Sequence, residues 1–367
     1  MSKNLNTTMK KLFYLLLALA VVSCGEPALS GPDWGNVQKP EPEQPKPEPE
    51  PEPEPNPDQP KPEIVIRNIE PTTELGAANE NIEGLRFYPG ISINIATSNF
   101  DTQLASIANA GFKYIEITIK DSFGALDMTD DQVKAKFTAR MNAVKAAGLT
   151  VWSIHLPYED ATWTNIAGKE SVRVQSVNNI MRVLRLCTEC FPECKNYVLH
   201  ASKGVLSPRS ESVNQARKSL TEMVPVATQL GVRLCVENLV GSLCYYYEEL
   251  HNTIVGIDNT WVTYDIGHAN CKGYDVVEFL SQIGTKLGTV HMHDTKFGSG
   301  NDSHSLLGDA SLAPGNIKQW DDVIHTLLET NRYRGVFMFE LSGKNPNTVM
   351  ESYNRIVGEY AAKYENK

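Results

Sequence analysis

The stretch 262–270, VTYDIGHAN, brings a carboxylate and an imidazole to positions where both could act on one small ligand. Residues Val262 to Asp265 alternate as in a β-strand, so Thr263 and Asp265 share one face. The apolar face is expected to pack outward against helices, which turns Asp265 inward at the carboxyl end of its strand. His268 follows on the first turn of the next loop, within reach of the same point. Such a pair suits a divalent cation or a proton-transfer site, although a hydrogen-bonded structural pair would look the same.

Five other strand-like runs end in a similar way. In each run, the large apolar residues lie on one face of the strand, and the last residue on the other face can bind a metal or transfer a proton. These last residues are His155, His200, Glu237, His291 and Glu340. One such residue could be a hydrogen-bonded group in a core. Six in the same phase, counting Asp265, would bury several charges together, which is costly unless a cation neutralises them. The pattern therefore predicts a metal site.

Residues of this kind need a scaffold that brings strand ends together. Short β-branched runs alternate with longer helical patterns from about residue 85 to residue 364. The strand-like runs are 91–95, 114–119, 151–155, 197–200, 233–237, 261–265, 289–293 and 336–340, and the helical patterns include 100–110, 130–147, 171–187, 210–230, 276–283, 317–330 and 346–364. Several helical patterns stop at a glycine just before the next strand, which is a C-cap signal.

Eight such repeats predict an α/β fold, a (β/α)8 TIM barrel, in which the carboxyl ends of the strands meet at one mouth. A doubly wound open sheet would show the same alternation. It would not place a metal-competent residue at the end of nearly every strand.

The first residues are expected to be a targeting segment. Lys10 and Lys11 precede an apolar run, and small residues lead to Cys24. Residues 1–23 resemble a bacterial lipoprotein signal, with cleavage before Cys24 and lipidation of its thiol. An ordinary transmembrane anchor is the alternative, but about 11 apolar residues are too few to span a bilayer easily. The mature protein is therefore expected to be anchored to a bacterial membrane through Cys24, facing the periplasm or the cell surface.

A low-complexity segment follows the signal. Residues 39–63 alternate proline with glutamate, and because proline fixes φ and glutamates repel each other, an extended polyproline-II spacer is expected. We expect a disordered Pro/Glu-rich linker and lead-in over 24–84 and the barrel over 85–367. The spacer carries much of the formal net charge of −10. No basic tract is visible, which argues against a nucleic-acid partner.

The motifs at the strand ends resemble those of the xylose isomerase-like barrel superfamily, which contains sugar isomerases and epimerases, inosose dehydratases and apurinic endonucleases. They are VENL at Glu237, YDIGH at Asp265 and His268, VHMHD at His291 and Asp294, APGNI at 313–317 followed by Trp320, and FMFEL at Glu340. The resemblance covers the chain from about residue 85 onward. It implies that Glu237, Asp265, His291 and Glu340 bind a metal, that Glu237 and Glu340 double as the acid/base pair, and that His268 contacts the substrate.

Elementary chemistry agrees with that implication. Three carboxylates and one imidazole suit Mn²⁺, Mg²⁺, Co²⁺ or Zn²⁺. Such a cation polarises a carbonyl and acidifies the neighbouring C–H bond. One carboxylate can then remove the proton to give an enediolate, and a second can return it on the opposite face. Together with the resemblance, this chemistry predicts a metal-dependent isomerase or epimerase acting on a small carbohydrate.

Two alternatives remain. If a β-hydroxyl leaves the enediolate first, the protein is a lyase or dehydratase acting on an oxidised sugar or a keto-glycoside. The other alternative is an inactive carbohydrate-binding lipoprotein, which the intact pair Glu237 and Glu340 disfavours because a binder has no need of both. The identity of the substrate and the oligomeric state stay open.

Further residues are assigned to the mouth of the barrel. The expected substrate-binding residues are His155, His200, His268, Glu116, Asp302 and His304. Asn94, Tyr158 and Trp163 are also expected there, with loop packing as the alternative for the two aromatic residues. By the same resemblance, His155, His200 and the Asp302–His304 pair match further ligands of the metal-dependent apurinic endonucleases, so a site with several metal ions is open. Export and the lack of a basic surface argue against DNA cleavage. Residues 302–313 are expected to form a long lid.

Six of the seven cysteines remain once Cys24 is set aside. The spacing of Cys187, Cys190 and Cys194 could suit zinc, but outside the cytoplasm a disulfide at the end of their helix is the commoner outcome. The loops that carry Cys244 and Cys271 could also be tied together. Cys235 shares a face with Glu237 and is expected to be a buried free thiol.

Overall fold

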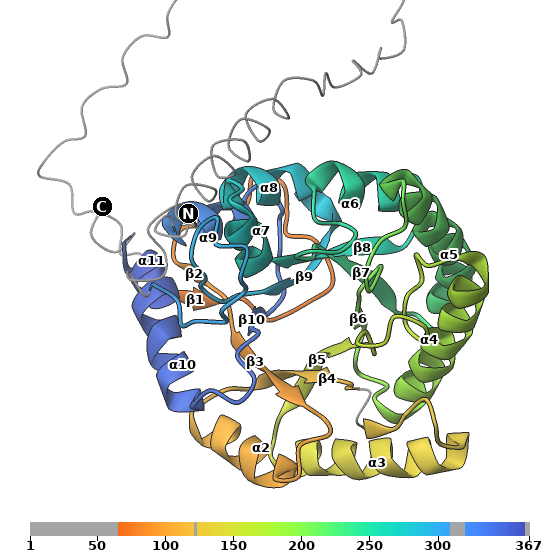
Figure 1. Ribbon diagram of the computed structural model, residues 1–367. Helices are drawn as coiled ribbons and strands as arrows, with labels where there is room; N and C mark the ends of the chain where they lie inside the picture. Colours follow the sequence, from red (N-terminus) through yellow and green to blue (C-terminus); the bar gives the residue numbers. More distant parts are fainter. Residues whose placement is uncertain (1–64, 121–122, 309–319, 364–367) are drawn as a thin grey trace, which may run out of the picture. The chain divides into compact units, whose positions relative to one another are not determined.

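The strands that carry the predicted site residues close into a barrel, which confirms the predicted fold. In the computed structural model, which describes residues 65–120, 123–308 and 320–363, eight parallel strands form one sheet in the order β10-β3-β4-β5-β6-β7-β8-β9. The seam between the first and last strands of this order is joined by a bridge between Met292 and Phe339, and Met292 N donates to Met338 O at 2.8 Å. Helices surround the strands as an outer ring (Figure 1).

The observed elements lie close to the predicted ones. The barrel strands are β3 (Pro89–Asn94), β4 (Tyr114–Thr118), β5 (Thr150–His155), β6 (Asn196–Leu199), β7 (Arg233–Glu237), β8 (Thr260–Asp265), β9 (Leu287–His291) and β10 (Phe337–Phe339). The helices are α2 (Phe100–Asn109), α3 (Asp130–Ala146), α4 (Glu170–Cys190), α5 (Arg209–Gln229), α6 (Tyr247–Ile254), α7 (Ile266–Lys272), α8 (Val276–Ile283), α9 (Trp320–Leu328), α10 (Pro346–Tyr353) and α11 (Glu359–Ala362). The single helix predicted over 346–364 is divided, because a π-helical turn (Asn354–Gly358) separates α10 from α11.

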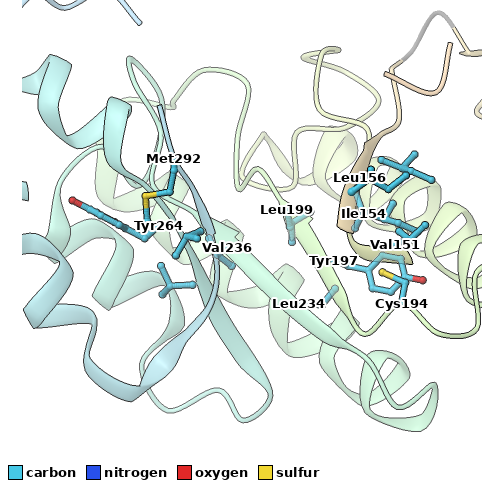
Figure 2. Packing of buried hydrophobic residues seen from close by; sticks show 14 of the residues in the cluster. Val151, Ile154, Leu156, Cys194, Tyr197, Leu199, Leu234, Val236, Tyr264 and Met292 are labelled. Atoms are coloured by element: carbon cyan, nitrogen blue, oxygen red, sulfur yellow. The ribbon is translucent and has the colours of Figure 1, made fainter. Parts of the chain in front are cut away.

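The hydrophobic core lies between the barrel wall and the helices. Every second residue of a strand points outward into this layer, and Figure 2 shows such residues on the strands β5 to β8, among them Ile154, Tyr197, Val236 and Tyr264. The intervening residues point into the barrel. This alternation, with a period of two, turns the last inward residue of each strand toward the mouth.

One residue departs from the alternation. Trp152 would lie outward in a regular strand, yet it packs with Val336 and Met338, and its indole N–H donates to Thr289 Oγ1 at 3.3 Å. The pairing of β4 with β5 shifts register between Ile115 and Glu116, as a β-bulge does. Trp152 is the extra residue, and its side chain fills the end of the barrel interior that lies away from the site.

The segment before the barrel is packed over its described part. β1 (Arg67–Asn68) pairs with β2 (Leu85–Arg86), and Arg334 donates to Glu80 at 2.8 Å. Arg233, the first residue of β7, donates to the backbone oxygen of Thr73. These contacts lie at the amino ends of the strands, opposite the predicted site, so described residues before the expected boundary at 85 pack against the barrel.

Residues 1–64 lie outside the described residues, and with them Cys24, the signal segment and the Pro/Glu spacer. Within the part of the chain that the structure describes, no helix combines the length and the apolar character needed to cross a membrane.

The expected disulfide at the end of α4 is not formed. The six cysteines of the described ranges are all free, and the buried Cys194 thiol donates to Asn196 O at 3.4 Å instead. Cys244 and Cys271 are not joined either, since their thiols face Thr253 Oγ1 and His268 O. Cys235 is a buried free thiol, as predicted.

Candidate metal centre

Four of the predicted residues converge from neighbouring strands. Glu237 ends β7, Asp265 ends β8, His291 ends β9, and Glu340 follows β10 directly. The parallel register places Asp265 beside His291. Each of the four residues offers one donor atom, and these atoms lie within 4.8 Å of one another.

His291 is the centre of this four-residue group. Its Nδ1 lies 3.3 Å from Glu237 Oε1, 3.3 Å from Glu340 Oε2 and 3.7 Å from Asp265 Oδ2. Three of the residues are fully buried, whereas the Glu340 side chain is 17% exposed and borders the mouth. One imidazole nitrogen therefore faces three carboxylates across a space that a cation could fill.

Glu116, predicted as a substrate-binding residue, lies behind this group and lines neither of the two cavities described below. It is fully buried, its Oε2 lies 3.1 Å from His291 Nε2, and the same oxygen accepts the Ser153 hydroxyl at 2.7 Å. A carboxylate on the far nitrogen of a metal-binding histidine fixes the ring orientation and raises the basicity of the ligand. We therefore assign Glu116 to orienting His291.

A second group of donors shares Glu237. His155 Nε2 and His200 Nε2 lie 3.2 Å and 3.0 Å from Glu237 Oε2, the oxygen that faces away from His291. The ring of Tyr158 covers both histidines, with centroid distances of 4.5 Å and 4.3 Å. The Tyr158 hydroxyl is held by Lys120. His155 is thus closed off from the mouth by Tyr158, while His200 stays partly exposed.

A third group is formed by His268, Asp302 and His304. Asp302 Oδ2 lies 2.6 Å from His304 Nε2 and 3.4 Å from His268 Nε2. The other nitrogens of the two histidines are fixed by backbone oxygens, His268 Nδ1 by Asn238 O at 2.8 Å and His304 Nδ1 by Glu340 O at 2.7 Å. The predicted lid thus contributes Asp302 and His304 to the site, and residues 309–313 of it lie outside the described residues.

Two polar cavities open beside these groups. One of about 260 Å³ is lined by Asn94, Lys120, Tyr158, His304 and Glu340, among others. The other, of about 340 Å³, is lined by residues that include Tyr158, His200 and His268. Hydroxyl, imidazole and charged groups line both, as a polar ligand requires. Trp163 is 38% exposed and lines neither cavity.

The charges of the site are set by burial and by mutual contact. Burial alone would raise the pKa of Glu237, but His291 and His200 hold that pKa well below its ordinary value. Burial would lower the pKa of His291, yet Glu116 and Glu340 hold it well above the ordinary value. Burial lowers the pKa of His200 to about 4. For His304, burial acts downward, but the hydrogen bond with Asp302 raises the pKa to about 9.

The donor set of the four-residue group fits a divalent cation. It combines three carboxylates with one imidazole in a buried place, and no lysine or arginine of the described ranges forms an ion pair with those carboxylates. Three buried carboxylates around one imidazole leave an excess of negative charge, which is costly unless a cation neutralises it. Carboxylate oxygens with one nitrogen suit Mg²⁺, Mn²⁺, Co²⁺ or Zn²⁺.

Two residues of the site were not singled out from the sequence. Asn238 Oδ1 accepts Asp265 N and its Nδ2 donates to Asp265 O, both at 2.8 Å, so it fixes the backbone of Asp265. His293 Nε2 lies 3.1 Å from Asp265 Oδ2. Two features of the sequence could have identified them. Asn238 directly follows Glu237, and His293 lies two residues after His291, so both histidines point to the same side of the strand.

Comparison with known proteins places the fold among described families. Residues 104–356 match the family described as xylose isomerase-like TIM barrel. An uncharacterised protein from Methanocaldococcus jannaschii is 32% identical over 169 residues, which cover 42% of this chain and 54% of that protein. The chain therefore spans about half the length of this relative.

Several solved structures are similar. A D-tagatose 3-epimerase-like protein has a TM-score of 0.60 and 22% identity, covering 75% of this chain and 98% of its own. A 3-keto-D-glucoside 4-epimerase from E. coli has a TM-score of 0.53 and 17% identity, covering 72% and 98%. A D-psicose 3-epimerase from Clostridium cellulolyticum H10 has a TM-score of 0.54 and 16% identity, covering 75% and 95%. At these identities the likeness shows the fold.

Proposed function

Since the chain belongs to the xylose isomerase-like TIM barrel family, we propose that it is a metal-dependent isomerase or epimerase of a small carbohydrate. The observation that carries the proposal is the placement of two carboxylates about one point. Glu237 and Glu340 each lie 3.3 Å from His291 Nδ1, and they come from strands that β8 and β9 separate around the barrel. The sugar epimerases among the similar structures support the same class of reaction.

The four-residue group would hold the cation. A divalent ion bound by Glu237, Asp265, His291 and Glu340 supplies the charge that polarises a substrate carbonyl and acidifies the neighbouring C–H bond. The chain orients these donors from behind. Glu116 fixes the His291 ring, and Asn238 fixes the backbone of Asp265.

Glu237 and Glu340 would move the proton. Burial acts to raise the pKa of both carboxyl groups, but the histidines beside them hold both pKa values below the ordinary value, so both start as carboxylates able to accept a proton. Glu340 borders the cavity of about 260 Å³, where it can reach a bound sugar. One carboxylate removes the proton next to the carbonyl to give an enediolate, and the other returns a proton to the opposite face. His268, which lines the second cavity, is placed to bind a hydroxyl of the substrate.

Proton exchange tests this proposal. The purified protein, loaded with Mn²⁺ or Mg²⁺, is incubated with keto-sugars in D₂O and followed by proton NMR. We expect deuterium at the carbon beside the carbonyl in the native protein and its loss in Glu340→Gln. Glu351→Gln, which changes an exposed residue of α10, is the matched control. Because Glu340 is also a metal-binding residue in this proposal, metal content is measured in the same samples.

The other outcomes discriminate between reaction classes. Release of water or of an aglycone would identify a lyase or dehydratase. A metal-loaded protein that binds sugar without exchange or turnover would be a carbohydrate-binding module.

One observation favours a second candidate, metal-assisted hydrolysis at a centre with more than one cation. The two oxygens of Glu237 face different groups of possible metal ligands. Oε1 faces His291 in the four-residue group, and Oε2 faces His155 and His200. Paired cations that share a carboxylate clamp both oxygens of a displacement at phosphorus. Two or more metal ions per chain, with cleavage of bis(p-nitrophenyl) phosphate and no exchange in D₂O, would favour this candidate over the first.

We also propose that the protein is lipid-anchored through Cys24 and faces the periplasm or the cell surface. The support is the sequence of the first 24 residues, in which two lysines, an apolar run and small residues precede the cysteine.

A further inference from the structure

His293 stands between two carboxylates of the site. It lies two residues beyond β9 and is fully buried. Its Nε2 is 3.1 Å from Asp265 Oδ2, and its Nδ1 is 3.6 Å from Asp302 Oδ1. Within the described part of the chain, His293 Nδ1 and Asp302 Oδ1 are buried atoms without a hydrogen-bond partner. A small movement would therefore join them, and a single imidazole would link the four-residue group to the group of Asp302.

The fold keeps a space for this ring. An ideal Cβ on Gly267 would lie 1.9 Å from His293 Cε1, so any other residue at position 267 would displace the imidazole. The ring also stacks on His304, with centroids 4.2 Å apart and planes 11° from parallel. Gly267 lies in α7 and its φ is outside the left-handed region. Glycine within a helix is destabilising relative to alanine. Here the backbone conformation does not require glycine, but the space occupied by the His293 ring does.

The contact bears directly on Asp265. Its Oδ1 accepts the backbone N–H of His268 at 2.6 Å, and its Oδ2 lies between His293 Nε2 and His291 Nδ1. Both oxygens of the carboxylate are thus held. With Oδ1 fixed by α7 and one side of Oδ2 fixed by His293, the free side of Oδ2 points toward the other donors.

We propose that His293 is a positioning residue that orients Asp265 for the cation and, through its second nitrogen, aligns Asp302. The inference rests on the metal centre of the proposed function. A hydrogen-bond partner behind a metal ligand is typically worth about 10- to 100-fold in metal affinity. His293→Ala is therefore expected to raise the dissociation constant for Mn²⁺ by about 10- to 100-fold without changing the number of ions bound.

A double-mutant cycle separates this role from general packing. Gly267→Ala should weaken Mn²⁺ binding in the same range as His293→Ala, because the added methyl group displaces the ring. The double variant should bind no more weakly than His293→Ala alone, since two changes that act through one contact are not additive. His293→Gln, whose amide nitrogen can take the place of Nε2, should recover most of the affinity.

The measurement is competition of Mn²⁺ between the protein and a chelator, with melting temperatures recorded for every variant. Gly358→Ala, at a position where a Cβ meets nothing within 4 Å, and His251→Ala, at an exposed helical site, are the matched controls and should bind as the native protein does.

Three results would overturn the inference. They are native-like affinity in His293→Ala, an additive loss in the double variant, and a lower number of bound ions in His293→Ala, which would make His293 a ligand itself. A native protein that binds no cation would instead overturn the proposed function, and this inference with it.

Discussion

Substitution of Asp265 should separate metal binding from folding, because this residue takes part in both. Its Oδ1 caps the amino end of α7 through the backbone N–H of His268, while its Oδ2 faces His291. Asparagine is about as good a helix N-cap as aspartate, whereas alanine costs about 1 kcal/mol. In the metal-free protein, Asp265→Asn should leave the free energy of unfolding nearly unchanged, and Asp265→Ala should lower it by about 1 kcal/mol.

The bound cation should change the free energy of unfolding more than the N-cap does. A ligand present at about 100 times its dissociation constant stabilises the native state by about 2.7 kcal/mol. For the barrel over residues 85–367, an unfolding entropy of about 2 cal/mol/K per residue makes 1 kcal/mol correspond to about 1–2 °C in melting temperature. The native protein should therefore melt about 3–5 °C higher with the cation than after chelation, and neither Asp265 variant should show this rise.

Thermal melts with and without Mn²⁺, combined with elemental analysis of the dialysed protein, measure both effects. Asp258→Asn, which changes an exposed loop residue, should behave as the native protein does. Stoichiometric metal in Asp265→Asn, or a native-sized rise in its melting temperature, would refute the assignment of Asp265 as a ligand.

Three further predictions follow from other parts of the chain. Cys24→Ser should abolish labelling by a fatty-acid probe in cells, and label that persists in this variant would contradict lipidation at Cys24. Glu80→Ala should lower the free energy of unfolding in urea by about 1–2 kcal/mol, because it removes a charged hydrogen-bond partner of Arg334, which is 7% exposed; Glu83→Ala, on the exposed face of the same segment, should not. Cation binding should release a proton near pH 7 and should weaken as the pH falls. Burial would lower the pKa of His291, but Glu116 and then Glu340 hold that pKa well above its ordinary value. The His291 imidazole therefore carries a proton that the cation must displace. Calorimetry in two buffers of different ionisation enthalpy measures the proton, and equal heats in both would contradict the prediction.

The positions of the strands and the inward facing of the site residues were readable from the sequence. Each predicted strand lies within two residues of the observed one, because β-branched runs bounded by glycine and polar residues are local signals. The period of two then decides which residue of a strand points inward. Asp265 and His291 could be placed on one side of the sheet in this way before their neighbours were known.

Two short helices, α6 and α7, were not singled out from the sequence. α6 is eight residues long and α7 seven, and α7 begins directly after Asp265, so the strand pattern leads into it without a break. Their stability comes from packing on the barrel, and in α7 also from the cap that Asp265 itself provides.

The depth of each inward residue was decided by the tertiary structure. Glu116 and Glu237 both point into the barrel, yet Glu116 lies behind His291 and Glu237 faces the donors of two groups. Strand stagger and the bulge at β5 set these heights, and they depend on pairing between strands, which local alternation does not record.

For the same reason, local sequence patterns could not predict the state of the thiols or the contacts of His293. The spacing of Cys187, Cys190 and Cys194 allowed a disulfide, but the three thiols are free, and Cys194, which lies beyond α4, donates to Asn196 O. His293 can reach Asp265 because Gly267 leaves room for its ring, which also stacks on His304. The sequence by itself determined the barrel and the set of inward chemical groups, since both follow from local period. Which of those groups meet was decided by tertiary structure, because contacts across a barrel depend on register, stagger and the space that a distant glycine leaves open.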